Sequence, residues 1–231
     1  MKTLFITATG TDIGKTYVTA ALARGLTAKG TSVRVLKPVI TGFDEAAIEG
    51  AIEGTDTAVL LAAAGLDANK DAINACSPWR FTEPLSPDMA ARRGGLKIDF
   101  DELVTFCRDA QDGGEDVLLI EGIGGVMVPL DSTDDSHTVL DWIEAAGQPA
   151  LLIAGSYLGT LSHTLTAVQT LQHRNIEIAG VIIAESEESP VPLAETVETL
   201  KRHLGNVAIA TVARNAEPED VLAAVAGITE L

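Results

Sequence analysis

Residues 8–16 read Ala-Thr-Gly-Thr-Asp-Ile-Gly-Lys-Thr and directly follow a short apolar run. This order can bind phosphate, because Gly14 lets the backbone approach an anion, Lys15 adds positive charge and the Thr16 hydroxyl can ligate Mg²⁺. Backbone N–H groups of the loop and of a following helix would point at the same anion. Thr9 replaces the first glycine of the usual pattern. The segment predicts a phosphate-binding loop for a nucleoside triphosphate; the alternative is a chance Gly-Lys-Thr in a turn.

Charged residues also follow two other apolar runs. Residues 117–120 end in Glu121, and an acid at the end of a central strand would face Mg²⁺ beside the phosphates. Residues 33–36 end in Lys37, whose ammonium could neutralise charge that develops during phosphoryl transfer. Asp56 stands at the expected start of a helix. It is either a second carboxylate for Mg²⁺ or an acid that favours the helix dipole, and the sequence leaves both interpretations open.

Three further positions could contact a substrate. Thr41 follows Lys37 closely and offers a hydroxyl. Residues 86–88 and 157–163 each form a turn before a helix, and the N-terminus of either helix could hold a carboxylate. His163 is more typical of a surface or core histidine than of a catalytic one. No Ser-His-Asp set, zinc-ligand spacing or nucleophilic cysteine context is visible in the sequence.

Short apolar runs alternate with helix-favouring stretches along the whole chain. The expected strands are residues 4–6, 33–36, 117–120, 150–154, 178–183 and 207–210. The expected helices are residues 16–29, 55–64, 86–93, 99–112, 138–146, 161–173, 193–204 and 218–226. Apolar strands with few polar residues are typical of a parallel sheet buried on both faces. We therefore expect a doubly wound, mostly parallel α/β fold with helices on both faces, in one domain over residues 1–231. Asp99 and Glu102 predict a capping box.

Composition limits the possible partners. The chain has 231 residues, 46% of them hydrophobic, and a formal net charge of −17. This charge argues against nucleic acid and against an anionic membrane surface. The N-terminal apolar run is too short for a signal peptide, and no stretch reaches the length of a membrane span, so we expect a cytoplasmic protein. Cys76 and Cys107 have no metal or redox spacing, and we expect both to be packing residues.

Five motifs in this order resemble those of the dethiobiotin synthetase family, within the phosphate-loop NTPase superfamily. They are the phosphate loop at residues 7–16, Lys-Pro-Val-Ile-Thr-Gly at 37–42, Phe-Thr-Glu-Pro-Leu-Ser-Pro at 81–87, Ile-Glu-Gly-Ile-Gly-Gly at 120–125 and Leu-Gly-Thr-Leu-Ser-His-Thr at 158–164. Each motif alone is unspecific, and the combination is specific.

The resemblance implies an ATP-dependent cyclo-ligase. CO₂ would add to one amine of 7,8-diaminononanoate, ATP would phosphorylate the resulting carbamate, and the second amine would close a cyclic urea with loss of phosphate. The family uses Mg²⁺ and is a homodimer, with the turn at residues 157–162 of one subunit taking the substrate carboxylate of the other.

The resemblance also implies residue roles. The phosphoryl and carbamate groups would be contacted by Lys37, Lys15 and Thr11. The nucleotide would be bound by Asp12, Ile13, Gly14, Lys15, Thr16, Tyr17, Asp56, Glu121, Gly122, Ile123 and Gly124. The substrate would be bound by Thr41, Lys37, Gly159, Thr160 and Ser162, and Mg²⁺ would be held by Thr16, Asp56 and Glu121.

The chain departs from the family pattern at several positions. Ala8 replaces a glycine, and Ser162 replaces an asparagine. Ala184 stands where the family often has an asparagine that reads the purine, and no proline occurs at residues 211–213. We therefore expect weak selection of the nucleotide base, unless Glu185 or the backbone substitutes. The acidic loop at residues 131–135 has no assigned role.

Two other functions compete with this interpretation. An amide ligase of the cobyrinate type would need an ammonia source, usually a glutaminase domain, for which the chain has no room. A nucleotide switch of the partition-ATPase type carries a second lysine early in its phosphate loop, and Gly10 occupies that position here.

Overall fold

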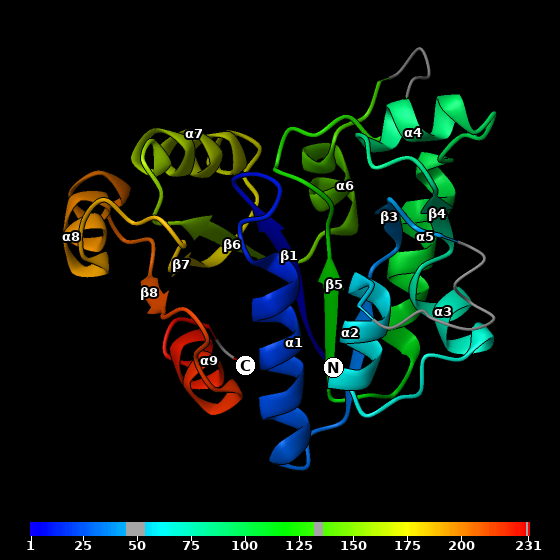
Figure 1. Ribbon diagram of the computed structural model, residues 1–231, viewed down its shortest axis with the longest axis horizontal. Helices are drawn as coiled ribbons and strands as arrows, with labels where there is room; N and C mark the ends of the chain where they lie inside the picture. The colour runs from blue at the N-terminus through cyan, green and yellow to red at the C-terminus, as the bar shows by residue number, and fades with distance from the viewer. Residues whose placement is uncertain (45–53, 132–135, 230) are drawn as a thin grey trace.

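A six-stranded parallel sheet forms the centre of the computed structural model, which describes residues 1–44, 54–131, 136–229 and 231 (Figure 1). Its spatial order is β2-β5-β1-β6-β7-β8. The strands are β1 (Lys2–Ala8), β2 (Val33–Leu36), β5 (Val117–Glu121), β6 (Ala150–Gly155), β7 (Ile178–Ala184) and β8 (Ile209–Val212). A separate parallel pair joins β3 (Val39–Thr41) to β4 (Trp79–Phe81). The predicted doubly wound α/β fold is confirmed.

Helices cover both faces of this sheet because its strands are apolar on both sides. The helices are α1 (Lys15–Ala28), α2 (Asp56–Ala63), α3 (Lys70–Cys76), α4 (Pro87–Arg93), α5 (Phe100–Asp109), α6 (Val139–Ala146), α7 (Thr160–His173), α8 (Leu193–Leu204) and α9 (Pro218–Ala226). A 3₁₀ turn at Ala110–Asp112 follows α5. Leu4 and Ile6 on β1 face the cluster that contains α1 and α9, whereas Phe5 faces the cluster with α5 to α8. This alternation is the period of an extended strand.

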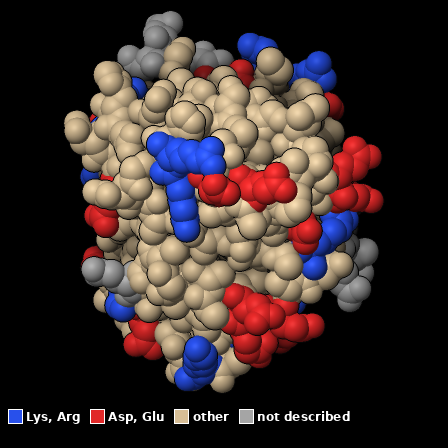
Figure 2. Space-filling model, turned by 90° about the vertical axis from the view of Figure 1, so that its left-hand side faces the viewer, with Lys and Arg blue, Asp and Glu red and all other residues tan. Residues whose placement is uncertain are grey.

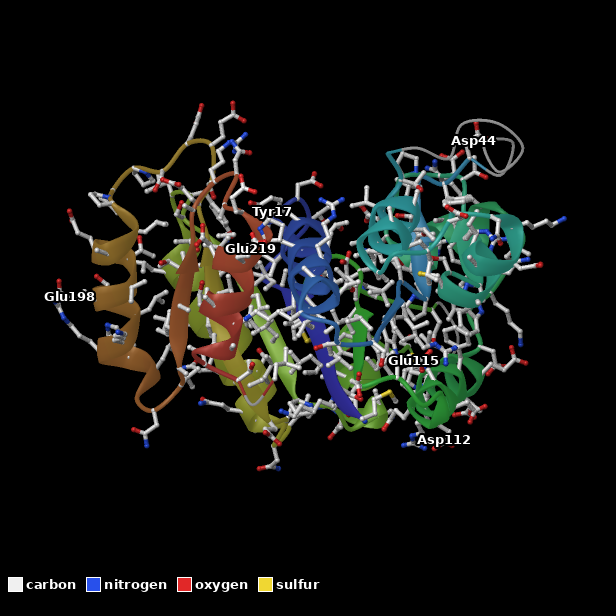
Figure 3. All side chains as sticks on the ribbon, turned by 90° about the horizontal axis from the view of Figure 1, so that it is seen from below. Tyr17, Asp44, Asp112, Glu115, Glu198 and Glu219 are labelled. Atoms are coloured by element: carbon white, nitrogen blue, oxygen red, sulfur yellow. The ribbon has the colours of Figure 1, made fainter. Side chains whose placement is uncertain are left out.

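The first and last helices pack closely against each other. Figure 3 shows α1, with Tyr17, beside α9, with Glu219. At Gly25 an added Cβ atom would lie 2.9 Å from the Pro218 carbonyl oxygen and 3.0 Å from the Leu222 Cβ. Glycine is therefore needed here for a close approach of two helices.

The carboxyl ends of parallel strands meet at one edge of a sheet, and ligands bind there. β1 lies between β5 and β6, and β2 lies on the other side of β5. The loop after β1, Lys37 after β2 and Glu121 at the end of β5 therefore reach one place. The sheet order thus explains why residues far apart in sequence form one site.

Most expected elements are present, with small shifts. β8 begins at Ile209 instead of residue 207. The predicted helix over residues 99–112 ends as an α-helix at Asp109 and continues as the 3₁₀ turn. β3, α3 and β4 were not predicted, because each is a segment of seven or fewer residues, which is too short to show a clear hydrophobic period.

One half of the capping box expected at the start of α5 is present, since the Asp99 carboxylate accepts a hydrogen bond from the Glu102 N–H group at 3.1 Å. The structure shows both halves of a capping box at α6, between Thr138 and Asp141. Cys76 and Cys107 are free and buried, as expected of packing residues.

The surface on the α8 side carries groups of acidic side chains with Lys and Arg between them (Figure 2). The described part of this face therefore shows no extended basic patch. Among the described residues, no helix is both long and apolar enough to cross a bilayer.

Candidate active site

The phosphate loop connects β1 to α1. Its conformation is unusual, because Asp12 has φ 56° and Gly14, the N-cap of α1, has φ 97°. A Cβ atom on Gly14 would lie 3.6 Å from the Ala184 Cβ, which is an ordinary contact. The left-handed backbone conformation, rather than lack of space, is therefore what requires glycine at this position.

Lys15 folds back over the loop. Its ammonium donates hydrogen bonds to the carbonyl oxygens of Gly10 at 3.1 Å and Gly124 at 2.9 Å. Burial, with a smaller effect from the charge on Lys37, lowers the pKa of Lys15 to about 8. The loop after β1 and the loop after β5 are thus joined by one cation.

A second cation, Lys37, follows the end of β2 and is only 3% exposed. Its Nζ atom is 2.5 Å from Glu121 Oε1, 3.2 Å from Asp56 Oδ2 and 3.1 Å from the Gly122 carbonyl oxygen. Burial lowers the pKa of Lys37, but the charges of Glu121 and Asp56 outweigh this effect and the pKa is raised. Lys37 is therefore a fixed positive charge at neutral pH.

Thr16 completes this cluster. Its hydroxyl donates a hydrogen bond to Glu121 Oε1 at 2.7 Å, so one carboxylate oxygen accepts from both Thr16 and Lys37. The four side chains come from α1, the end of β2, the start of α2 and the end of β5. The Thr55 hydroxyl caps α2 by accepting from the Ala58 N–H group, which leaves the Asp56 carboxylate available to the cluster.

The donor set fits a magnesium ion. Glu121 is fully buried, and its Oε2 atom has no hydrogen-bond partner among the described residues. Such an orphaned oxygen is costly unless a donor or a cation satisfies it. The Asp56 side chain is 44% exposed, and with the Thr16 hydroxyl it adds the oxygen ligands that Mg²⁺ prefers.

A cavity of about 820 Å³ opens above this cluster. The residues lining it that the sequence analysis assigned to the site are Thr11, Asp12, Gly14, Lys15, Thr16, Tyr17, Lys37, Thr41, Asp56, Ile123 and Gly124. Glu121 and Gly122 do not line the cavity themselves, but both accept hydrogen bonds from Lys37, which does.

The cavity also has an apolar wall, of which the sequence analysis named only Ser86 and Pro87 as possible substrate contacts, in the turn at residues 86–88. It consists of Ile40, Pro84, Leu85, Pro87 and Val128, with Ser86 beside them. The Pro-Leu-Ser-Pro motif was a signal for part of this wall, and Ile40 lies within the motif at residues 37–42, but Val128 lies in a segment without a distinguishing pattern.

A second cavity, of about 430 Å³, adjoins the first. Asp12, Gly14 and Tyr17 line both, and Ile13 lines the second. Its far side is formed by residues 184–187, at and after the end of β7, and residues 212–215, at and after the end of β8. There the Glu185 carboxylate accepts a hydrogen bond from the Arg214 backbone N–H group at 2.9 Å.

Gly159, Thr160 and Ser162 do not line either cavity of their own chain. The Thr160 side chain is buried, and its hydroxyl donates to the Gly155 carbonyl oxygen at 2.6 Å. This bond holds the start of α7 against β6. The expected substrate contact by these residues is therefore not formed within one chain.

The acidic loop at residues 131–135 lies outside the described residues except for Asp131. The Asp131 carboxylate forms a hydrogen bond with the His137 ring at 2.7 Å.

The fold and this site define a nucleoside-triphosphate-binding protein of the phosphate-loop class. A family model described as an AAA domain matches residues 2–223. Similar solved structures include the MinC:MinD cell division complex of Aquifex aeolicus, at 12% identity over 97% of this chain and 93% of that chain, with a TM-score of 0.57. The hydrogenase maturation factor HypB of Archaeoglobus fulgidus has 11% identity over 99% of this chain and 91% of that chain, with a TM-score of 0.55. At these identities the likeness concerns the fold alone.

Sequence relatives identify the family. The ATP-dependent dethiobiotin synthetase BioD of Acidiphilium cryptum is 48% identical over 89% of both chains. The protein of the same name in Methylobacterium nodulans is 43% identical over 93% of this chain and 94% of that protein. The chain therefore belongs to the ATP-dependent dethiobiotin synthetase family.

Proposed function

We propose that this protein is the ligase that converts 7,8-diaminononanoate, CO₂ and ATP to dethiobiotin, ADP and phosphate in biotin biosynthesis. The observation that carries the proposal is the cluster of Lys37, Glu121, Asp56 and Thr16 below the phosphate loop. Family membership supports the same function over a nucleotide switch or an amide ligase.

The reaction needs three bond changes at the cavity. An amine nitrogen bonds to the carbon of CO₂ and loses a proton, which gives a carbamate. A carbamate oxygen bonds to the γ-phosphorus as the bond to ADP breaks. The second amine nitrogen then bonds to the carbamate carbon and releases a proton to solvent, as the bond from that carbon to the phosphate oxygen breaks and phosphate leaves. Each step concentrates negative charge on oxygen, so positioned cations are the main requirement.

Lys15 and Lys37 meet this requirement from two sides. The Lys15 ammonium, which reaches the Gly10 and Gly124 carbonyls, is placed to hold the phosphates of the bound nucleotide. Lys37 lines the cavity together with Thr41 and is placed to hold the carbamate and the transferring phosphoryl group. Thr11 adds a loop hydroxyl at the cavity.

Magnesium would be held by Thr16, Asp56 and Glu121, and when bound it would neutralise charge on the triphosphate oxygens. The phosphates would lie in the first cavity and the base in the second, since Gly14 and Tyr17 line both. The apolar wall with Pro84 and Leu85 suits the methylene chain of the diamine, and Thr41 offers it a polar contact.

We also propose a homodimer in which Gly159, Thr160 and Ser162 serve the site of the partner chain. Leu158 is 86% exposed and Met127 is 58% exposed, and burial of these apolar side chains would favour an interface. The start of α7 would then offer backbone N–H groups to the substrate carboxylate.

A single domain over residues 1–231 is supported by the packing of α9 against α1. A cytoplasmic location is supported by the use of ATP.

Phosphate release from ATP tests the function. We expect it to require both 7,8-diaminononanoate and bicarbonate, and we expect a product with the mass of dethiobiotin. Equal phosphate release without the diamine would favour a nucleotide switch and overturn the proposal.

A further inference from the structure

The oxygen atoms that suit a divalent cation are already in contact with an ammonium. Lys37 Nζ lies between Glu121 Oε1 and Asp56 Oδ2, at 2.5 and 3.2 Å. Glu121 Oε1 also accepts a hydrogen bond from the Thr16 hydroxyl, so Lys37 contacts two of the candidate metal ligands directly and the third bonds to one of these two. The same two carboxylates would serve Lys37 and Mg²⁺.

We infer that Lys37 competes with the divalent cation for Asp56 and Glu121, so that metal loading releases the lysine into the reaction cavity. The inference rests on the proposed function, because it concerns how that site is switched on. The position of the Lys37 ammonium would therefore depend on the metal.

Charge and geometry support an exchange rather than joint occupancy. Two carboxylates face two ammoniums, those of Lys15 and Lys37, so the cluster is close to neutral without a metal. A divalent cation bound to Glu121 Oε2 and Asp56 would add repulsion against an ammonium that lies 2.5 Å from Oε1 of the same carboxylate. Mg²⁺ also demands a strict octahedral arrangement, which a cation on Glu121 Oε1 and Asp56 would obstruct.

The released side chain has a place to go. Lys37 lines the cavity of about 820 Å³ together with Thr41, and its four-carbon stem is flexible. An ammonium that leaves Asp56 can turn toward this space while it remains near the Gly122 carbonyl oxygen, 3.1 Å away. The lysine would therefore meet the carbamate only after the metal is in place, which links the two events.

Binding of Mn²⁺ alone to the protein without nucleotide, measured by electron paramagnetic resonance, tests the competition. We expect Lys37→Met to bind Mn²⁺ at least tenfold more tightly than the wild type. Lys37→Arg keeps the charge and should show no gain. Lys15→Met is the matched control, because it removes a nearby charge whose hydrogen bonds go to carbonyl oxygens instead of carboxylates, and its gain should be below threefold. Equal gains in Lys37→Met and Lys15→Met would overturn the inference.

Chemical labelling of the wild type gives a second test that needs no variant. Saturating Mg²⁺ without nucleotide should increase acetylation of Lys37 severalfold, measured by peptide mass, while exposed Lys201 on α8 stays unchanged. No increase at Lys37 would contradict the exchange. Neither test uses the diamine or bicarbonate, so a failure here is distinct from a failure of the proposed reaction.

Discussion

Replacement of Lys37 by methionine should impair both catalysis and stability. The side chain keeps its approximate volume, so the change removes the ammonium without a large cavity. Loss of one such charge contact in a water-poor site costs about 3 kcal/mol, which predicts a fall in kcat of about 10²- to 10³-fold.

The effect on stability follows from the same contacts. Glu121 is fully buried, and without Lys37 its Oε1 atom keeps only the hydrogen bond from Thr16. Removal of one partner from a buried ion pair costs about 3–5 kcal/mol. The exposed Asp56 contributes less, so we use the lower end. For a chain of this size, about 3 kcal/mol corresponds to a fall in Tm of about 6–12 °C.

Steady-state phosphate release with saturating ATP, diamine and bicarbonate measures the first effect, and circular dichroism during heating measures the second. Lys201→Met on α8 is the control, because it removes an exposed lysine far from the cavity and should change neither value. A folded Lys37→Met protein with kcat within about threefold of the wild type would refute the assignment of Lys37. An unchanged Tm would refute the argument from the buried ion pair.

Three other results are expected. Because the pKa of Lys15 is lowered to about 8, its ammonium loses a proton in the free protein above that pH. The affinity for ATP should therefore fall by up to about tenfold per pH unit between pH 8 and 10. Calorimetry should show this slope in the wild type and its absence in Lys15→Ala. Because Ala184 cannot give the paired hydrogen bonds of an amide, kcat/KM for CTP and GTP should lie within about tenfold of that for ATP; a hundredfold preference for ATP in initial rates would contradict this. In a verified heterodimer, a Lys37→Ala chain and a Gly159→Val chain should together regain part of the activity that each homodimer lacks, and no recovery would count against a shared site.

The sequence predicted the positions of the main elements because their patterns are long and local. The strand-end rule also placed Lys37 and Glu121 at the phosphate loop correctly. It could not predict that Lys37 contacts Glu121 and Asp56 directly, because that contact depends on the lateral order of β2, β5 and the start of α2.

Other parts of the site lacked a local signal. Val128 lines the cavity through tertiary packing, and no spacing distinguishes it from core residues. Ile40 stands in the motif at residues 37–42, but its apolar side chain is of the type that core positions have. Thr160 has a residue type that suits substrate binding, yet its hydroxyl bonds to Gly155 within the chain. Side-chain direction at such positions is set by neighbours that are distant in sequence.

The place of β1 in the sheet has a consequence for synthesis on the ribosome. β1 carries the phosphate loop and is made first, but its two neighbours are β5 and β6, with Lys2 paired to Val117 and Phe5 to Ala150. The helix that follows the loop packs against α9, the last helix of the chain. Contacts between distant segments form slowly, and a partly made chain exposes its apolar strands. The nucleotide site should therefore mature only after nearly all of the chain has emerged, which makes the nascent protein dependent on protection against aggregation until then.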